Sequence, residues 1–313
     1  MNERTQLSLK LIVSHVILLP LLIFISLIIN KDSFLLVSIT QTVLIILLLS
    51  GYWEFLGLRF KKIYFFSSEA ILILVLLLRL LYLNKTGNNL YLVVILALLE
   101  FWLSFLLVKI IISIFRREKE AIEIVFPFRQ GKYLITDGGN SRISRLMNYH
   151  YFSPVHKKKK TNLSMLFATD IVKIKNSGSN YLPPENDSYS IFGEKVFSPA
   201  GGVVVMVENS IKDNVPYSGN YPYNTGNTIV IRQGNNYLLL GHLKMDSIRV
   251  KEGDIINAND LIAEAGNSGY SERPHIHIQL INSLTDSYWS GKGVSMEYKG
   301  KNLYKNRLIR LDF

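Results

Sequence analysis

The chain has 313 residues, a formal net charge of +11 and no cysteine. The lack of cysteine excludes disulfides and thiolate metal sites, so any metal ion must be held by His, Asp or Glu. The positive charge suits a surface that works near polyanions such as anionic lipids or wall polymers. The sequence carries no nucleic-acid-binding motif, and we expect no nucleic-acid partner.

Apolar residues are concentrated in the N-terminal part of the chain. A bilayer core needs about 20 apolar helical residues, and three of the four runs reach that length. The first run is too long for a signal peptide and lacks a small-residue cleavage site, so we interpret it as an anchor. We predict an α-helical transmembrane bundle of about four helices within residues 1–118; the alternative is four buried helices of a soluble protein. The runs are Leu9–Ile29, Phe34–Leu49, Tyr64–Leu83 and Leu90–Phe115.

Several ionisable residues lie inside these runs. Charges within lipid are costly and often functional, which leaves a transport or signalling role open. Glu69 and Lys109 lie where their side chains could extend to an interface, and Arg79 could pair with Glu100 between the third and fourth helices. His15, in the first run, is expected to be buried between helices.

The charges that flank the apolar runs conflict with a placement of the C-terminal part outside the cytoplasm. Under the positive-inside rule they would put both ends of a four-helix bundle in the cytoplasm. A re-entrant second run would give three spans and place the C-terminal part outside. The flanking charges are Arg4, Lys10, Arg59, Lys61, Lys62, Arg116, Arg117 and Lys119.

Residues 119–313 have the pattern of an all-β domain, either an antiparallel sheet or a sandwich. Many short strands separated by turns rich in Gly and Asn are typical of that class, and no convincing amphipathic helix competes with them. The long segment Asn209–Asn227, rich in Asn, Pro, Gly and Tyr, is expected to be a binding loop. The predicted strands are Ala121–Phe128, Lys132–Thr136, Gly202–Glu208, Thr228–Gln233, Tyr237–Leu243, Asp254–Ile256 and His275–Ile281.

Three histidines and one aspartate indicate a metal centre. His275 and His277 are two residues apart on a predicted strand, so they project from the same face. Alone, such a pair could be one core and one surface histidine. However, His242 also ends an apolar strand, and Asp170 lies within the apolar run 167–172, where a carboxylate needs a partner. Two histidines and one carboxylate are a known ligand set of hydrolytic zinc centres.

Residues 121–300 resemble the lysostaphin-type (LytM-type) zinc metallopeptidases, which cut bacterial peptidoglycan cross-bridges. Five segments carry the resemblance in the family's order. They are similar to the family's "APxxGxV", "GNxVxI", "YxHL", "VxxGxxVxxGxxIGxxGxTG" and "PHLHF", and they comprise Val196–Val204, Gly226–Ile231, Leu240–Leu243, Val250–Gly269 and Pro274–Ile278.

The resemblance implies a fold like a duplicated hybrid motif, one Zn²⁺ per chain and a role for each polar residue of the centre. Asp170 and His277 would be zinc ligands. His242 and His275 would flank the zinc-bound water, one helping to deprotonate it and the other stabilising the oxyanion. Zinc lowers the pKa of its water and polarises the scissile carbonyl, and a nearby imidazole can transfer the proton.

One position departs from the family pattern. Most members have "HxGxD", but the position four residues before Asp170 is Leu166. A related subgroup instead has "GGN…NYH" upstream, which Gly138–Asn140 and Asn148–His150 resemble, so His150 is the expected third ligand. The fallback ligand is His156, beside the Lys157–Lys160 run, which we expect to be a solvated loop or a contact to anionic polymers.

Together these features predict a membrane-anchored zinc endopeptidase that hydrolyses peptide bonds of peptidoglycan. We expect it in a bacterial cell membrane, multi-pass, with the peptidase domain (119–313) outside the cytoplasm and with the lipid bilayer and wall peptide as its partners. Leu166 motivates the alternative of an inactive regulator that binds wall peptide or another protein. A third hypothesis is a transporter with a sensing domain. The four helices have few polar faces, which disfavours this hypothesis.

Overall fold

The computed structural model describes residues 33–81, 90–152, 161–174, 183–219, 221–222, 224–285 and 287–311. They form two compact units, a helical unit that ends at Ile111 and a β unit that begins at Ile112. The apolar run Leu9–Ile29, the Lys157–Lys160 run and His156 lie outside the described residues.

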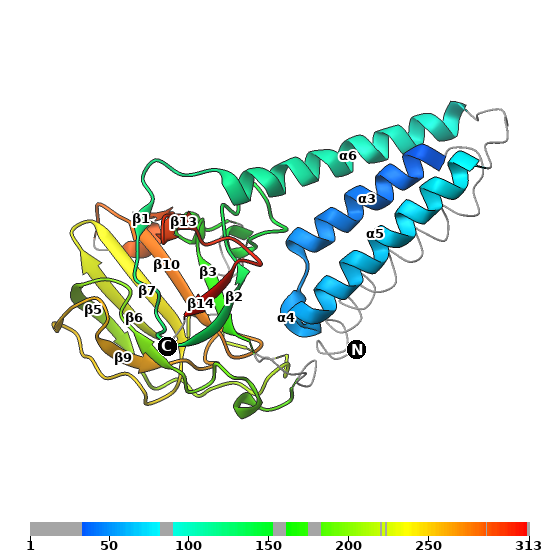
Figure 1. Cartoon of the computed structure of the whole chain (residues 1–313). Coiled ribbons are helices and arrows are strands. Elements are labelled where there is room, and N and C mark those ends of the chain that lie inside the picture. Colours follow the sequence, from blue (N-terminus) through cyan, green and yellow to red (C-terminus); the bar gives the residue numbers. More distant parts are fainter. Residues whose placement is uncertain are drawn as a thin grey trace. The chain divides into compact units, whose positions relative to one another are not determined.

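The helical unit contains the helices α3 (Ser33–Ser50), α4 (Trp53–Leu56), α5 (Leu58–Leu81) and most of α6 (Leu90–Phe115). The helix α3 packs between α5 and α6 (Figure 1). Its contact with α5 is apolar and includes Leu44 and Leu72. Its contact with α6 includes Ile39 and Leu96.

Polar side chains of α3 bind the two carboxylates that the sequence places inside the apolar runs. The Gln41 amide donates to Glu69 Oε1 at 2.7 Å. The hydroxyls of Ser38 and Thr42 donate to Glu100 Oε1 at 2.9 and 2.8 Å. Both carboxylates are therefore held between helices. The side chain of Arg79, the expected partner of Glu100, lies outside the described set.

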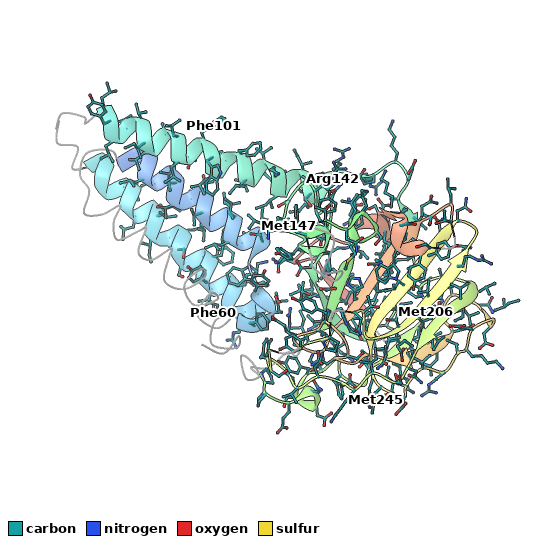
Figure 2. The ribbon with its side chains drawn as sticks, turned by 180° about the vertical axis from the view of Figure 1, so that it is seen from behind. Phe60, Phe101, Arg142, Met147, Met206 and Met245 are labelled. Carbon is teal, nitrogen blue, oxygen red and sulfur yellow. The ribbon has the colours of Figure 1, made fainter. Side chains whose placement is uncertain are left out.

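Within the described residues, α6 is the one helix that is both long and apolar enough to cross a membrane, with a mean hydropathy of 2.5. The apolar part of α3, Leu35–Ser50, is shorter. Most of the large apolar side chains of α6 are exposed, and Phe101, labelled in Figure 2, is 74% exposed. One candidate span is thus present, and the multi-helix membrane bundle stays a prediction.

The β unit is built around a nine-stranded sheet in which neighbouring strands pair antiparallel. The strand order is β14-β2-β3-β10-β7-β6-β5-β8, and β11 pairs with the far end of β10. The strands are β2 (Gly131–Asp137), β3 (Thr169–Lys173), β5 (Gly202–Glu208), β6 (Asn227–Gln233), β7 (Asn236–Leu243), β8 (Ile255–Ile256), β10 (Ile276–Asn282), β11 (Lys292–Val294) and β14 (Leu308–Leu311).

Two small sheets complete the β unit. The strands β1 (Ile122–Glu123), β12 (Met296–Tyr298) and β13 (Lys301–Asn302) form one of them, in which β1 and β12 are parallel. The strands β4 (Lys195–Phe197) and β9 (Leu261–Glu264) form the other. The prediction of a mostly antiparallel all-β fold is confirmed.

Most of the predicted strands are present with small shifts of their ends. The prediction for Gly202–Glu208 matches β5 at both ends, and five others correspond to β2, β6, β7, β8 and β10. The prediction of a strand over Ala121–Phe128 is wrong beyond Glu123. Ile124 donates its backbone N–H to the Glu297 carbonyl, whereas Val125 donates to the Pro199 carbonyl. Successive residues thus bond to different segments, and no continuous strand pairing forms.

Alternation along β10 separates the core from the polar face of the sheet. Ile276, Ile278 and Leu280 belong to the main hydrophobic cluster of the β unit. His277 and Gln279 alternate with them and therefore point to the other face. Apolar packing on one face thus holds a strand whose opposite face carries the candidate site.

Candidate metal centre

The pairing of β3 with β10 brings Asp170 and His277 together. The two residues are direct partners in the antiparallel register. Directly opposed residues lie close enough for their side chains to interact. His277 Nδ1 is 2.9 Å from Asp170 Oδ1, and Asp170 is 15% exposed. Two strands that are more than a hundred residues apart in the chain thus supply two of the expected ligands.

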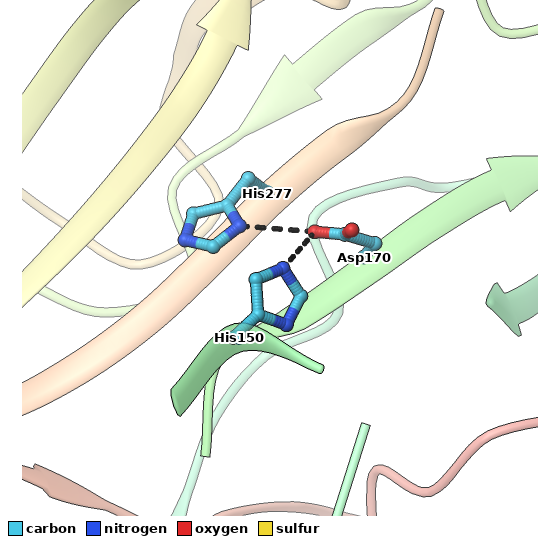
Figure 3. A group of neighbouring side chains, drawn as sticks. All are labelled: His150, Asp170 and His277. Carbon is cyan, nitrogen blue, oxygen red and sulfur yellow. Dashed lines mark hydrogen bonds and ion pairs between the residues drawn. The ribbon is translucent and has the colours of Figure 1, made fainter. Parts of the chain in front are cut away.

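His150 reaches the same carboxylate from a short 3-10 helix, His150–Phe152. Its Nε2 is 3.2 Å from Asp170 Oδ1, and its ring centre is 4.8 Å from that of His277. Figure 3 shows both imidazole rings directed at the same oxygen of Asp170. One ligand atom from each of His150, Asp170 and His277 lies within 4.8 Å of the other two.

His242 and His275 lie beside this group. The ring centres of His242 and His275 are 4.6 Å apart, and the ring centre of His242 is 5.7 Å from that of His277. His275 Nε2 is 3.5 Å from Asp170 Oδ2. All five site residues predicted from the sequence therefore come together. His242, His275 and His277 are each less than a tenth exposed.

A local irregularity in β7 brings His242 to this face. Strict alternation would turn His242 to the side of Leu238 and Leu240, which belong to the main core. Instead His242 has a positive φ of 60°, and the register between β6 and β7 shifts at this end. Such a bulge re-aims a side chain. The preceding residue is Gly241, the partner of His277 on the neighbouring strand, and it carries no side chain that could fill the site.

The electrostatics of the group centre on Asp170. Burial alone would raise the pKa of this carboxyl, but His150 and His275, together with hydrogen bonds, hold the pKa well below its usual value. For His150, burial lowers the pKa while the charge of Asp170 raises it, and the net shift is upward. The carboxylate is therefore ionised and attracts positive charge at this point.

The other two histidines are held in the neutral form. Burial and the neighbouring imidazoles lower the pKa of His242 well below 6.5. Burial also lowers the pKa of His275, against the opposing effect of Asp170. Buried imidazoles that stay neutral near pH 7 can accept a proton during a reaction.

The donor atoms fit a zinc ion. Two imidazole nitrogens and one carboxylate oxygen are the donor types that Zn²⁺ takes in three-ligand sites that leave a position for solvent or substrate. His277 Nδ1 and His150 Nε2 lie 2.9 and 3.2 Å from Asp170 Oδ1. A cation placed among these three atoms would contact all of them.

Two buried amides next to the ligands were given no role in the site from the sequence. Asn148 Oδ1 is 2.8 Å from His150 Nδ1, and Gln279 Oε1 is 3.1 Å from His277 Nε2. Both residues are fully buried. The position of Gln279, two residues after His277 on a strand, was a usable signal, because alternation places it on the same face.

The segment Asn209–Asn227 is tied to the loop that supports the other two histidines. Asn214 donates its side-chain N–H groups to the carbonyls of Gly269 and Ser271. Ser268 contributes its carbonyl oxygen to His242 Nδ1 at 2.8 Å. This long segment is therefore attached to the framework of the site.

Residues 188–289 match the family model described as Peptidase family M23. The matched stretch includes His242, His275 and His277, whereas His150 and Asp170 precede it. The peptidoglycan DD-endopeptidase ShyA of Vibrio cholerae is 36% identical over 89 residues, which are 28% of this chain and 18% of ShyA. These similarities support an M23-type peptidase domain in the β unit.

Two further comparisons found similarity over part of the chain. Lysostaphin of Staphylococcus simulans is 32% identical over 66 residues, covering 21% of this chain and 13% of lysostaphin. A crystal structure of a zinc-containing peptidase from Vibrio cholerae gives a TM-score of 0.30 at 23% identity, covering 50% of this chain and 35% of that one. The chain thus matches less than a fifth of the length of ShyA or lysostaphin.

Proposed function

We propose that the protein is a membrane-anchored zinc metalloendopeptidase that hydrolyses peptide bonds of bacterial peptidoglycan. Residues 1–118 would form the membrane region and residues 119–313 the peptidase domain. The observation that carries the proposal is the convergence of three ligand-type side chains and two neutral histidines on one face of the sheet. The sequence similarity to ShyA and lysostaphin supports peptidoglycan as the substrate.

His150, Asp170 and His277 would hold the ion through Nε2, Oδ1 and Nδ1. When bound, zinc supplies a Lewis acid that lowers the pKa of water and polarises a carbonyl. The pairing of β3 with β10, in which His277 is opposite Asp170, would hold two of the three ligands side by side.

The surroundings of His242 and His275 prepare them for proton transfer. His242 Nδ1 faces the Ser268 carbonyl at 2.8 Å, and His275 Nδ1 faces the Arg273 carbonyl at 2.8 Å. Because a carbonyl oxygen only accepts, each Nδ1 carries the hydrogen and each Nε2 keeps a free lone pair. Both rings therefore offer a basic nitrogen to the site.

The two histidines differ in their relation to Asp170, which supports separate roles. Burial lowers the pKa of His275, but the Asp170 carboxylate, whose Oδ2 lies 3.5 Å from Nε2, acts in the opposite direction. The pKa of His242 is held well below its usual value. We therefore assign His242 as the group that takes the proton from the attacking water. His275 would stabilise the oxyanion as its imidazolium form, with the added proton on Nε2, a form that the Asp170 carboxylate favours.

Membrane anchoring rests on the exposed apolar surface of α6. A core helix of a soluble protein would bury this surface, whereas most of the large apolar side chains of α6 are exposed. We place the β unit outside the cytoplasm because its substrate lies there. Added protease should degrade the β unit in spheroplasts with an intact membrane, and full protection there would contradict this placement.

Hydrolysis is tested with the full chain in detergent and purified peptidoglycan, by analysing the released peptides. The parent chain should cleave wall peptides, whereas His277→Ala and His242→Ala should not. His277→Ala should also lose zinc, while His242→Ala should retain it. Equal cleavage by the parent and His277→Ala would refute the proposal.

One observation favours an inactive regulator as the second candidate. The family's usual first ligand position holds Leu166, which is buried. A chain that binds wall peptide with the same affinity with and without zinc, and that never cleaves it, would support this alternative.

A further inference from the structure

Asn148 connects the segments that carry two of the three ligands. Its side-chain N–H groups donate to the carbonyls of Gly139 at 2.7 Å and Ala168 at 2.9 Å. Ala168 lies two residues before Asp170, and Asn148 lies two residues before His150. One fully buried amide therefore joins the chain on both sides of the candidate centre.

These bonds fix the orientation of the amide. Because carbonyl oxygens only accept, the nitrogen of Asn148 must face Gly139 and Ala168, and its oxygen must face His150. That oxygen is 3.1 Å from the backbone nitrogen of His150 and 2.8 Å from Nδ1. A reversed amide would lose all four interactions, so a single orientation is allowed.

The orientation of Asn148 decides which ring nitrogen of His150 carries hydrogen. The amide oxygen only accepts, so Nδ1 must donate to it. Nε2 is then the atom with a lone pair when the ring is neutral, and it is the atom that lies 3.2 Å from Asp170 Oδ1. Partners of this kind hold metal-ligating histidines in the required tautomer and ring orientation.

We propose that Asn148 is a positioning residue. It restricts His150 to metal coordination through Nε2 and holds the segments that carry His150 and Asp170 in a fixed position relative to each other. This inference rests on the proposed zinc function. It gives Asn148 a role in metal affinity that is separate from its contribution to the fold.

The first test measures zinc affinity by competition with a chelator, using the full chain in detergent. Asn148→Leu keeps the approximate size of the side chain but removes its donors and its acceptor. Loss of such a partner weakens metal binding by about 10- to 100-fold, and we expect a loss in this range.

The control is Asn162→Leu. Asn162 is also buried, and its Oδ1 accepts from Ser164 N and Oγ at 3.2 and 2.7 Å without contacting a histidine. This variant should show a lower unfolding temperature but keep zinc affinity within about threefold of the parent. An Asn148→Leu chain within threefold of the parent, or an equal loss in both variants, would overturn the proposal.

The second test needs no variant of Asn148, so it remains decisive if Asn148→Leu does not fold. In the metal-free parent chain with ¹⁵N-labelled histidine, the His150 signals are identified by their loss in His150→Ala. They should report hydrogen on Nδ1. A neutral ring with hydrogen on Nε2 alone would refute the inference. Neither test depends on hydrolysis, so a chain that binds zinc without cleaving peptidoglycan would fail the proposed function and leave the role of Asn148 standing.

Discussion

Replacing His150 with alanine removes one of the three proposed ligands and tests which residue stands in for the family's usual first histidine. Four-ligand structural zinc sites bind with apparent free energies of about 10–16 kcal/mol, so an equal share for each ligand is about 2.5–4 kcal/mol. With about 1.4 kcal/mol for each factor of ten, His150→Ala should bind zinc about 60- to 700-fold more weakly. His156→Ala is the matched control and should bind zinc like the parent.

A second variant asks whether a histidine at position 166 could replace His150. The Cβ of Leu166 lies 3.1 Å from the position that a Cβ on Gly293 would occupy, and Gly293 pairs with Ile281. Ile281 is four residues beyond His277 on β10, which is about 13 Å along a strand. An imidazole cannot span that distance, so His150→Ala combined with Leu166→His should not regain zinc affinity.

Competition with a chelator on the full chain in detergent gives the zinc affinity of each variant. Unchanged affinity in His150→Ala would refute the assignment of His150. Recovery in the double variant would show that position 166 reaches the metal and would refute the reasoning from strand register.

The remaining predictions concern the framework and the proton-transfer residues. Gly269→Ala should destabilise the chain by about 3 kcal/mol or more in chemical denaturation, because a Cβ there would lie 2.2 Å from the Gly226 nitrogen. Gly253→Ala has a similarly positive φ but open space, and it should cost only about 1–2 kcal/mol; equal losses would contradict this difference. In a plot of kcat/KM against pH, the decline on the acid side should have its midpoint below pH 6.5. The reason is that the low pKa of His242 keeps this base neutral as the pH drops. A midpoint above that value would argue against His242 as the base.

The fold was predictable where a short apolar segment lies between clear turn residues. Gly202–Glu208 follows a glycine-rich turn, and its predicted ends match β5. The apolar segment Ala121–Phe128 looked the same to sequence analysis, but its backbone bonds go to Glu297 and Pro199 in turn. Hydrophobic periodicity indicates which residues are buried, but it does not indicate which segment the backbone hydrogen-bonds to.

The candidate site was predictable in its residue types and less so in its geometry. The spacing of His275 and His277 placed both on one face, and family resemblance pointed to His150. The positive φ of His242 depends on a local bulge that no spacing rule gives. The contact between Asn148 and His150 depends on carbonyls of Gly139 and Ala168, whose approach arises only in the folded chain.

The most direct test of the central claim is an anomalous-scattering map at the zinc edge from crystals of the unmodified chain grown with zinc. We predict one peak bonded to His150 Nε2, Asp170 Oδ1 and His277 Nδ1 at about 2.0–2.2 Å. A map with no peak at these atoms, or with zinc bound elsewhere while the three side chains remain paired with one another, would contradict it.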